Sequence, residues 1–138
     1  MLRSLLLLTL IAFPAMADDK EDLKALAGTW TIEKFVYEGA DLTGTFKDAT
    51  LVLDGTTYTL TNGKDVDKGT FVIDSSKTPK WMDLTGTEGP SKDKKFFCIY
   101  EVKDGVMSVC YNLDEKGRPA KLETAKDSKT MVITYKKK

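Results

Sequence analysis

Short segments of alternating apolar and polar residues occupy the chain from Trp30 to Tyr135. Side chains of a β-strand point to opposite faces in turn, so this period of two predicts strands with one buried face. The segments are rich in Val, Ile, Thr, Tyr and Phe, and we expect strands at residues 29–37, 50–53, 57–60, 69–73, 80–84, 96–102, 106–113, 120–124 and 130–135. The segments between them are too short for the helices of parallel crossovers, which argues against an α/β fold.

Turn residues separate the predicted strands and set their order. Asp54-Gly55 and Asp104-Gly105 each lie between two strand-forming segments and predict β-hairpins. Strands joined in this way form an antiparallel meander, which hides its edges most simply by closing into a barrel. The sequence therefore predicts an all-β barrel of eight or nine strands, with a two-sheet sandwich as the alternative. Residues 86–95 are expected to be the longest irregular segment.

The residues before the first strand divide into two parts. Residues 1–17 contain Arg3, a short apolar run and a small-residue end, Ala15-Met16-Ala17, which is the pattern of a cleavable secretory signal. The apolar run is shorter than the roughly 20 residues that span a bilayer, so we expect no membrane anchor after cleavage. Residues 18–26 predict a short helix. We expect residues 18–138 to form one exported domain, periplasmic or extracellular.

The chain contains no histidine. This removes the commonest general base, the commonest metal ligand and every Ser-His or Cys-His nucleophile pair. Asp83 and Glu101 are the acids with the most apolar neighbours, but acids of strands usually face solvent. We therefore expect no catalytic residue, no metal site and no cofactor. Basic and acidic residues number 21 each and are interspersed, so nucleic acid is not an expected partner.

A group of short motifs extends over residues 26–135. It comprises Leu26-Ala27-Gly28-Thr29-Trp30, Leu51-Val52-Leu53-Asp54-Gly55, Gly69-Thr70-Phe71, Pro79-Lys80-Trp81-Met82-Asp83-Leu84, Gly89-Pro90, Ile99-Tyr100-Glu101, Val109-Cys110 and Arg118-Pro119. Together the motifs resemble a lipocalin-like domain family of planctomycete-type bacteria. The resemblance implies an exported eight-stranded barrel whose closed end is plugged at Gly28 and Trp30. It implies no activity, and Cys98 departs from the family pattern, in which a small residue is expected.

Cys98 and Cys110 lie on either side of the turn at Asp104-Gly105. If this turn is a three-residue loop, the two cysteines face each other, and a cross-strand disulfide follows as a hypothesis in an oxidising compartment. If Asp104 and Gly105 form a two-residue turn, the cysteines point to opposite faces of the sheet. The sequence leaves both registers open.

Four aromatic residues are the candidate ligand-binding residues: Trp81, Phe96, Tyr100 and Tyr111. Eight strands leave room for interior side chains or for one small ligand, and of these two we favour a filled interior. The first function hypothesis is a non-enzymatic exported barrel that binds a small apolar molecule at its mouth. The alternative is an envelope or extracellular protein-interaction module with a solid core, and an enzyme using carboxylates alone comes third.

Overall fold

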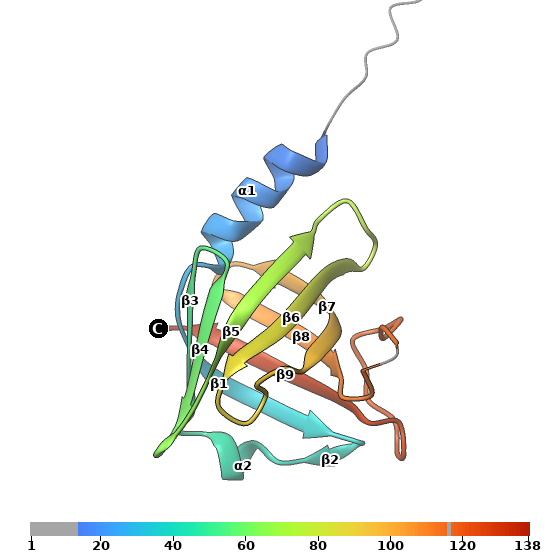
Figure 1. The fold of residues 1–138 in the computed structure, drawn as a ribbon. Helices are drawn as coiled ribbons and strands as arrows, with labels where there is room; N and C mark the ends of the chain where they lie inside the picture. Colours follow the sequence, from blue (N-terminus) through green and yellow to red (C-terminus); the bar gives the residue numbers. More distant parts are fainter. Residues whose placement is uncertain (1–13, 116) are drawn as a thin grey trace, which may run out of the picture.

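The structure is a computed structural model that describes residues 14–115 and 117–138. Within these residues it has two helices and nine strands (Figure 1). The helices are α1 (Pro14–Leu26) and α2 (Thr43–Phe46). The strands are β1 (Gly28–Tyr37), β2 (Ala40–Asp41), β3 (Thr50–Asp54), β4 (Thr57–Asn62), β5 (Asp65–Asp74), β6 (Lys80–Glu88), β7 (Lys95–Lys103), β8 (Val106–Asn112) and β9 (Thr130–Lys137).

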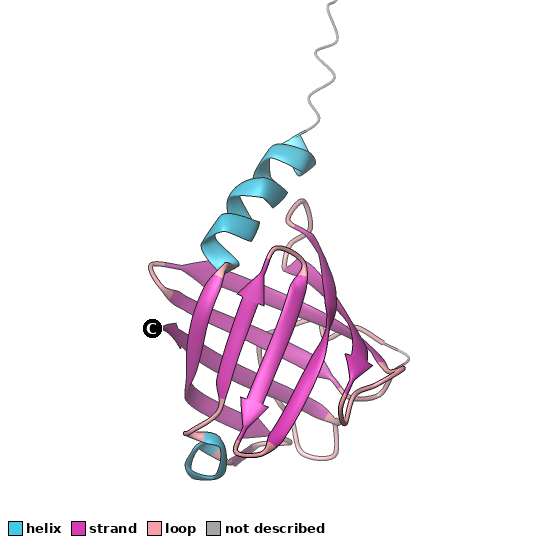
Figure 2. Ribbon diagram, turned by 60° about the vertical axis from the view of Figure 1, so that its left-hand side comes forward, coloured by secondary structure: helices cyan, strands magenta, loops and turns pink. Residues whose placement is uncertain are grey.

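Eight of these strands close into a barrel. Each barrel strand pairs antiparallel with the next, and β1 pairs with both β3 and β9, so the sheet returns to its start. The ninth strand, β2, pairs only with the end of β1. Figure 2 shows the front and back walls of the barrel with their strands crossing. The predicted all-β barrel is confirmed, and the sandwich alternative is wrong.

Both predicted hairpins are present. Asp54 pairs with Thr57 at the turn between β3 and β4. Lys103 pairs with Val106 between β7 and β8, which makes Asp104-Gly105 a two-residue turn. The φ angles of its two residues are 53° and 76°, and this left-handed pair matches the twist of the flanking strands. The turn chemistry of the sequence therefore fixes the order and register of these strands.

One predicted strand is wrong. Residues 120–124 form no strand and belong to an irregular segment, residues 113–129 with residue 116 undescribed, which we call the outer strap. The reason is topological: β8 pairs with β7 and β9, and β9 pairs with β8 and β1, so neither neighbouring strand has a free edge for residues 120–124. The outer strap is therefore the longest irregular segment between strands, in place of residues 86–95, because β6 extends to Glu88.

The two helices lie at opposite ends of the barrel (Figure 1). At the α1 end, Leu26 and Trp30 are fully buried, and Trp30 Nε1 donates a hydrogen bond to Leu26 O at 2.8 Å. Asp22 of α1 accepts hydrogen bonds from Tyr100 Oη at 2.6 Å and from Lys80 Nζ at 2.8 Å. These contacts attach α1 to β6 and β7 and close this end.

The predicted signal, residues 1–17, lies almost entirely outside the described residues, since the description begins at residue 14. The predicted cleavage point after Ala17 falls within α1. The helix predicted at residues 18–26 is present and ends at Leu26 as expected. Gly28, with a φ of 133°, then connects α1 to the start of β1.

Candidate ligand cavity

A cavity of about 320 Å³ lies inside the barrel. All eight barrel strands contribute inward-pointing side chains, and Phe46 of α2 lines it as well, so the cavity reaches the α2 end. We expected a filled interior from the sequence, and that expectation is wrong. The lining is mostly aliphatic and aromatic: Ile32, Phe35, Phe46, Ala49, Leu51, Leu53, Tyr58, Leu60, Met82, Leu84, Phe96, Met107, Val109, Tyr111, Leu113, Met131, Ile133 and Tyr135.

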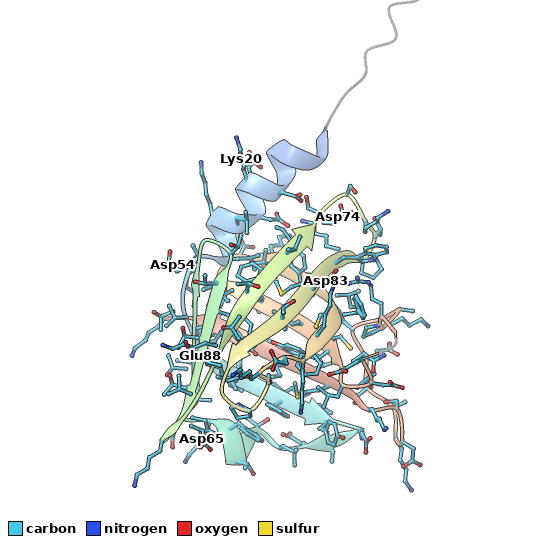
Figure 3. The ribbon with its side chains drawn as sticks, viewed as in Figure 1. Lys20, Asp54, Asp65, Asp74, Asp83 and Glu88 are labelled. Carbon is cyan, nitrogen blue, oxygen red and sulfur yellow. The ribbon has the colours of Figure 1, made fainter. Side chains whose placement is uncertain are left out.

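Three further polar residues line the cavity: Asn62, Asp67 and Ser91. Asn62 ends β4, and Asp67 lies near the start of β5, at the α2 end, where Figure 3 places Asp65. Asp67 Oδ1 accepts a hydrogen bond from the Ser91 N–H at 3.2 Å. The β6–β7 loop that carries Ser91 therefore forms part of the cavity wall at its mouth.

The β6–β7 loop packs tightly against β5. Gly89 has a φ of 85°, and a Cβ at this position would lie 2.2 Å from Val66 O. A Cβ at Gly86 would lie 1.8 Å from Ser91 O. Only glycine fits such close backbone approaches, and only glycine adopts the Gly89 φ without strain. The two glycines thus allow the loop to lie directly on the rim of the cavity.

Tyr111 and Tyr135 place a pair of hydroxyl groups in the cavity lining. Their hydroxyl oxygens lie 2.7 Å apart and share one hydrogen bond. Burial raises the pKa of both side chains above the ordinary value, so both are uncharged at neutral pH. Two hydroxyl groups carry two protons, and a single hydrogen bond between them uses one. The second proton has no acceptor among the described residues.

Tyr58 lines the same cavity from β4. Its ring packs over Gly69 of β5, where a Cβ would lie 2.5 Å from a ring carbon. Burial raises the pKa of Tyr58 to about 12, and the charge of Asp67 adds to the rise. Tyr58 and Tyr135 were missed in the sequence, although each lies two residues from another lining residue, Leu60 or Ile133. The period of two was the signal that identifies them.

The aromatic residues predicted to bind a ligand are not all at the cavity. Phe96 of β7 and Tyr111 of β8 line it. Tyr100 is buried in the interior but lies at the α1 end, where its hydroxyl donates to Asp22. Burial and this hydrogen bond both raise the pKa of Tyr100. Tyr100 therefore helps to close the barrel and does not line the cavity.

Trp81 lies on the outer face of the barrel with 38% of its surface exposed. Its neighbour Met82 lines the cavity, so by alternation Trp81 must point outward. Two cations lie close to the ring, with Arg118 Cζ 4.3 Å and Lys77 Nζ 4.7 Å from its centre. An external hollow of about 410 Å³ lies beside it, lined by residues that include Asp19 and Asp74. Trp81, a predicted ligand-binding residue, therefore does not line the interior cavity.

The two cysteines are free thiols on opposite faces of the sheet. Cys98 pairs with Tyr111 and Cys110 pairs with Ile99, which is the register of the two-residue turn. Cys98 belongs to the interior core, whereas Cys110 lies under the outer strap with its Sγ 3.7 Å from Glu123 O. Burial raises the pKa of both thiols. The hypothesis of a Cys98–Cys110 disulfide is therefore wrong.

Arg118 attaches the outer strap to the barrel. Its Nη2 forms an ion pair with Asp83 Oδ1 at 2.5 Å, and Figure 3 shows Asp83 on the wall formed by β6. Its guanidinium carbon also lies 5.3 Å from the centre of the Phe97 ring. Ile99, which points away from the barrel interior, is nevertheless fully buried. The strap therefore covers a small apolar cluster on the outside of β7 and β8.

Within residues 14–115 and 117–138, no group of three or more His, Cys, Asp or Glu side chains is placed to hold a metal ion. No described helix is both long and apolar enough to cross a membrane. Comparisons of the chain with protein-family models, curated proteins and solved structures gave no match. The resemblance to a lipocalin-like family therefore stays a prediction.

Proposed function

We propose that this chain is an exported, non-enzymatic barrel that binds one small apolar molecule in its interior cavity. The observation that carries the proposal is the apolar hollow of about 320 Å³ inside the barrel. Folded interiors are packed as densely as organic crystals and contain few voids larger than a water molecule. Ligand sites typically have volumes of roughly 300–1,000 Å³. The cavity has the size of a small ligand site.

The chemistry of the wall supports an apolar ligand. Water inside such a cavity loses hydrogen bonds that it makes in bulk, because most of the wall offers no donor or acceptor. The wall atoms in turn lack dispersion contacts on their cavity side. An apolar molecule that enters restores these contacts and leaves water behind. Binding is therefore favoured by removal of apolar surface from water on both partners.

A protein-interaction module with a solid core is the weaker alternative. Its premise was a filled interior, and the barrel is hollow. Among the described residues, the exposed large apolar side chains come from four strands, and two of them, Val72 and Trp81, lie together at the external hollow: Val52, Val66, Val72, Trp81 and Val106. A few exposed apolar residues of this kind are ordinary on protein surfaces.

Two alanine positions provide a matched test of ligand binding in the cavity. Ala49 lines the cavity and is 2% exposed, whereas Ala40 of β2 is exposed. Ala49→Leu fills part of the cavity, so we expect about tenfold weaker binding of the uncharged dye aminoanthracene with no loss of thermal stability. Ala40→Leu should bind the dye like the parent protein. Equal dye binding by the two variants, or no dye binding by the parent, contradicts the proposal.

Export has its own test, because that part of the proposal rests on residues 1–17. Expression of the full chain in a bacterium should release a processed protein into the periplasm or the medium. We expect its amino terminus, determined by sequencing, to be Asp18. Unprocessed protein retained in the cytoplasm with its leader intact contradicts export.

A further inference from the structure

The Tyr111–Tyr135 pair presents to the cavity a hydroxyl proton that the chain itself does not use. Tyr111 and Tyr135 both line the cavity, and their hydroxyls share a single hydrogen bond of 2.7 Å. Whichever hydroxyl donates, the other keeps a proton without an acceptor among the described residues. The pair is part-buried in a mostly apolar wall, so a bound molecule with an oxygen atom at this point gains a hydrogen bond from the spare proton.

The charges on the cavity wall decide whether a neutral or a negatively charged oxygen binds there. The described lining residues include no Lys or Arg, and the acid among them, Asp67, lies at the mouth. A carboxylate that enters an apolar site loses its hydration, and only a nearby cation compensates for this loss. Here a carboxylate finds no cation in the lining and is repelled by Asp67. A ketone, ester or ether loses far less hydration and needs only the one donated hydrogen bond.

We infer that the cavity selects an uncharged molecule with one hydrogen-bond-accepting oxygen, held by the Tyr111–Tyr135 hydroxyl pair, and rejects the corresponding carboxylate. This inference rests on the proposed function and names the class of ligand that the cavity takes. The ligand is therefore an apolar chain or ring with a carbonyl or ether oxygen, and not a fatty acid anion.

Three ligands with ten carbon atoms each separate the contributions of apolar contact, the hydrogen bond and charge to binding. Decane tests the apolar cavity alone, methyl octyl ketone adds a neutral acceptor oxygen, and decanoate carries a charge. Competition against aminoanthracene should give the ketone roughly fivefold tighter binding than decane, the gain of one ordinary hydrogen bond. Decanoate should bind more than about tenfold more weakly than the ketone at neutral pH, where it is ionised.

Two variants with matched controls assign these preferences to residues. The double variant Tyr111→Phe with Tyr135→Phe should bind decane at least as well as the parent while losing the preference for the ketone. Tyr37→Phe is the control, since Tyr37 does not line the cavity. Asp67→Asn should strengthen decanoate binding several-fold without changing ketone binding, because it removes the charge and keeps an acceptor for the Ser91 N–H. Asp65→Asn, at an exposed position outside the lining, should change neither.

The possible results distinguish failure of the proposed function from failure of the inference about ligand class alone. If none of the three ligands displaces the dye, the proposed function fails, and the inference fails with it. If decane binds but decanoate competes as well as the ketone, the cavity is a binding site and the inference is overturned. Retention of the ketone preference by the double tyrosine variant also overturns it, since the hydroxyl pair is then not the donor.

Discussion

The two ends of the barrel interior use aromatic side chains in different ways. At the α1 end, the Trp30 indole and the Tyr100 hydroxyl each donate to a group of α1, so their polar atoms are satisfied within the chain. In the cavity, the hydroxyls of Tyr111 and Tyr135 bond only to each other. Both regions contain large aromatic side chains, so the hollow does not arise from a shortage of them. The α1 end is completed by the chain's own helix, whereas the proposed function fills the cavity with a molecule from outside.

The largest predicted loss of stability comes from disrupting the packing at the closed end of the barrel. Trp30→Ala should lower the free energy of unfolding by about 3–5 kcal/mol, because it leaves a large void in a fully packed site. Phe46→Ala in α2 should cost only about 1–2 kcal/mol, since Phe46 is partly buried and its main partner is the Phe35 ring at 4.4 Å. Urea unfolding measures both values. Equal losses for the two variants contradict the contrast between a packed end and a hollow one.

The next effect concerns the loop at the mouth. Gly89→Ala should destabilise the protein by about 3 kcal/mol, because the new Cβ meets Val66 O and the φ is left-handed. Gly63→Ala has a left-handed φ but open space around the Cβ, so it should cost about 1 kcal/mol. Thermal unfolding of the two variants gives the comparison. If Gly89→Ala is the milder substitution, the loop does not lie against β5 as described.

Alkaline pH tests the burial of the cavity tyrosines. The pKa of Tyr58 is raised to about 12 in the folded protein, from about 10 in an unfolded chain. The folded state therefore binds this proton more tightly, and its stabilising contribution is complete below about pH 10 and is lost as the pH rises toward 12. Stability measured by urea unfolding should fall across this window by about 2 kcal/mol from Tyr58 alone. A Tyr58→Phe variant with the same pH dependence as the parent would count against this assignment.

The smallest effect concerns the outside of the barrel. Arg118→Ala should cost about 1 kcal/mol and should loosen the outer strap, so that a thiol reagent reaches Cys110 faster than in the parent. Adding Cys110→Ser to that variant should abolish the faster reaction. Lys80→Ala breaks a partly exposed ion pair with Asp22 and should leave thiol reactivity unchanged. Thiol labelling followed by mass spectrometry distinguishes these results, and equal labelling of Cys110 in the parent, Arg118→Ala and Lys80→Ala proteins contradicts the role of Arg118.

The closed barrel was predictable because alternation within strands and turn residues between them are local features of the sequence. Tyr58 and Leu60 alternate with the threonines of β4, which sets one inward face within a strand. Asp104-Gly105 carries the residue types that a tight hairpin needs. The strand predicted at residues 120–124 failed because closure of the barrel by β1 and β9 is a long-range event that no local pattern records.

The site was only partly predictable for the same reason. Phe96 and Tyr111 were predicted as ligand-binding residues and line the cavity. Trp81 was predicted because it is aromatic, although its position next to the inward-facing Met82 makes it point outward. The register that separates Cys98 from Cys110 depends on the conformation of a single turn. Whether a barrel is hollow depends on how side chains from eight strands together fill one volume. No single segment of the sequence determines that filled volume.

Methionine methyl groups offer the most direct measurement of the central claim. The proposed cleavage after Ala17 would remove Met1 and Met16, and the remaining methionines, Met82, Met107 and Met131, all line the cavity. The processed protein with methyl-labelled methionine should therefore show NMR shifts at all these methyl groups when methyl octyl ketone is added. Methyl resonances that stay in place at saturating ketone, with the protein folded, would contradict the account.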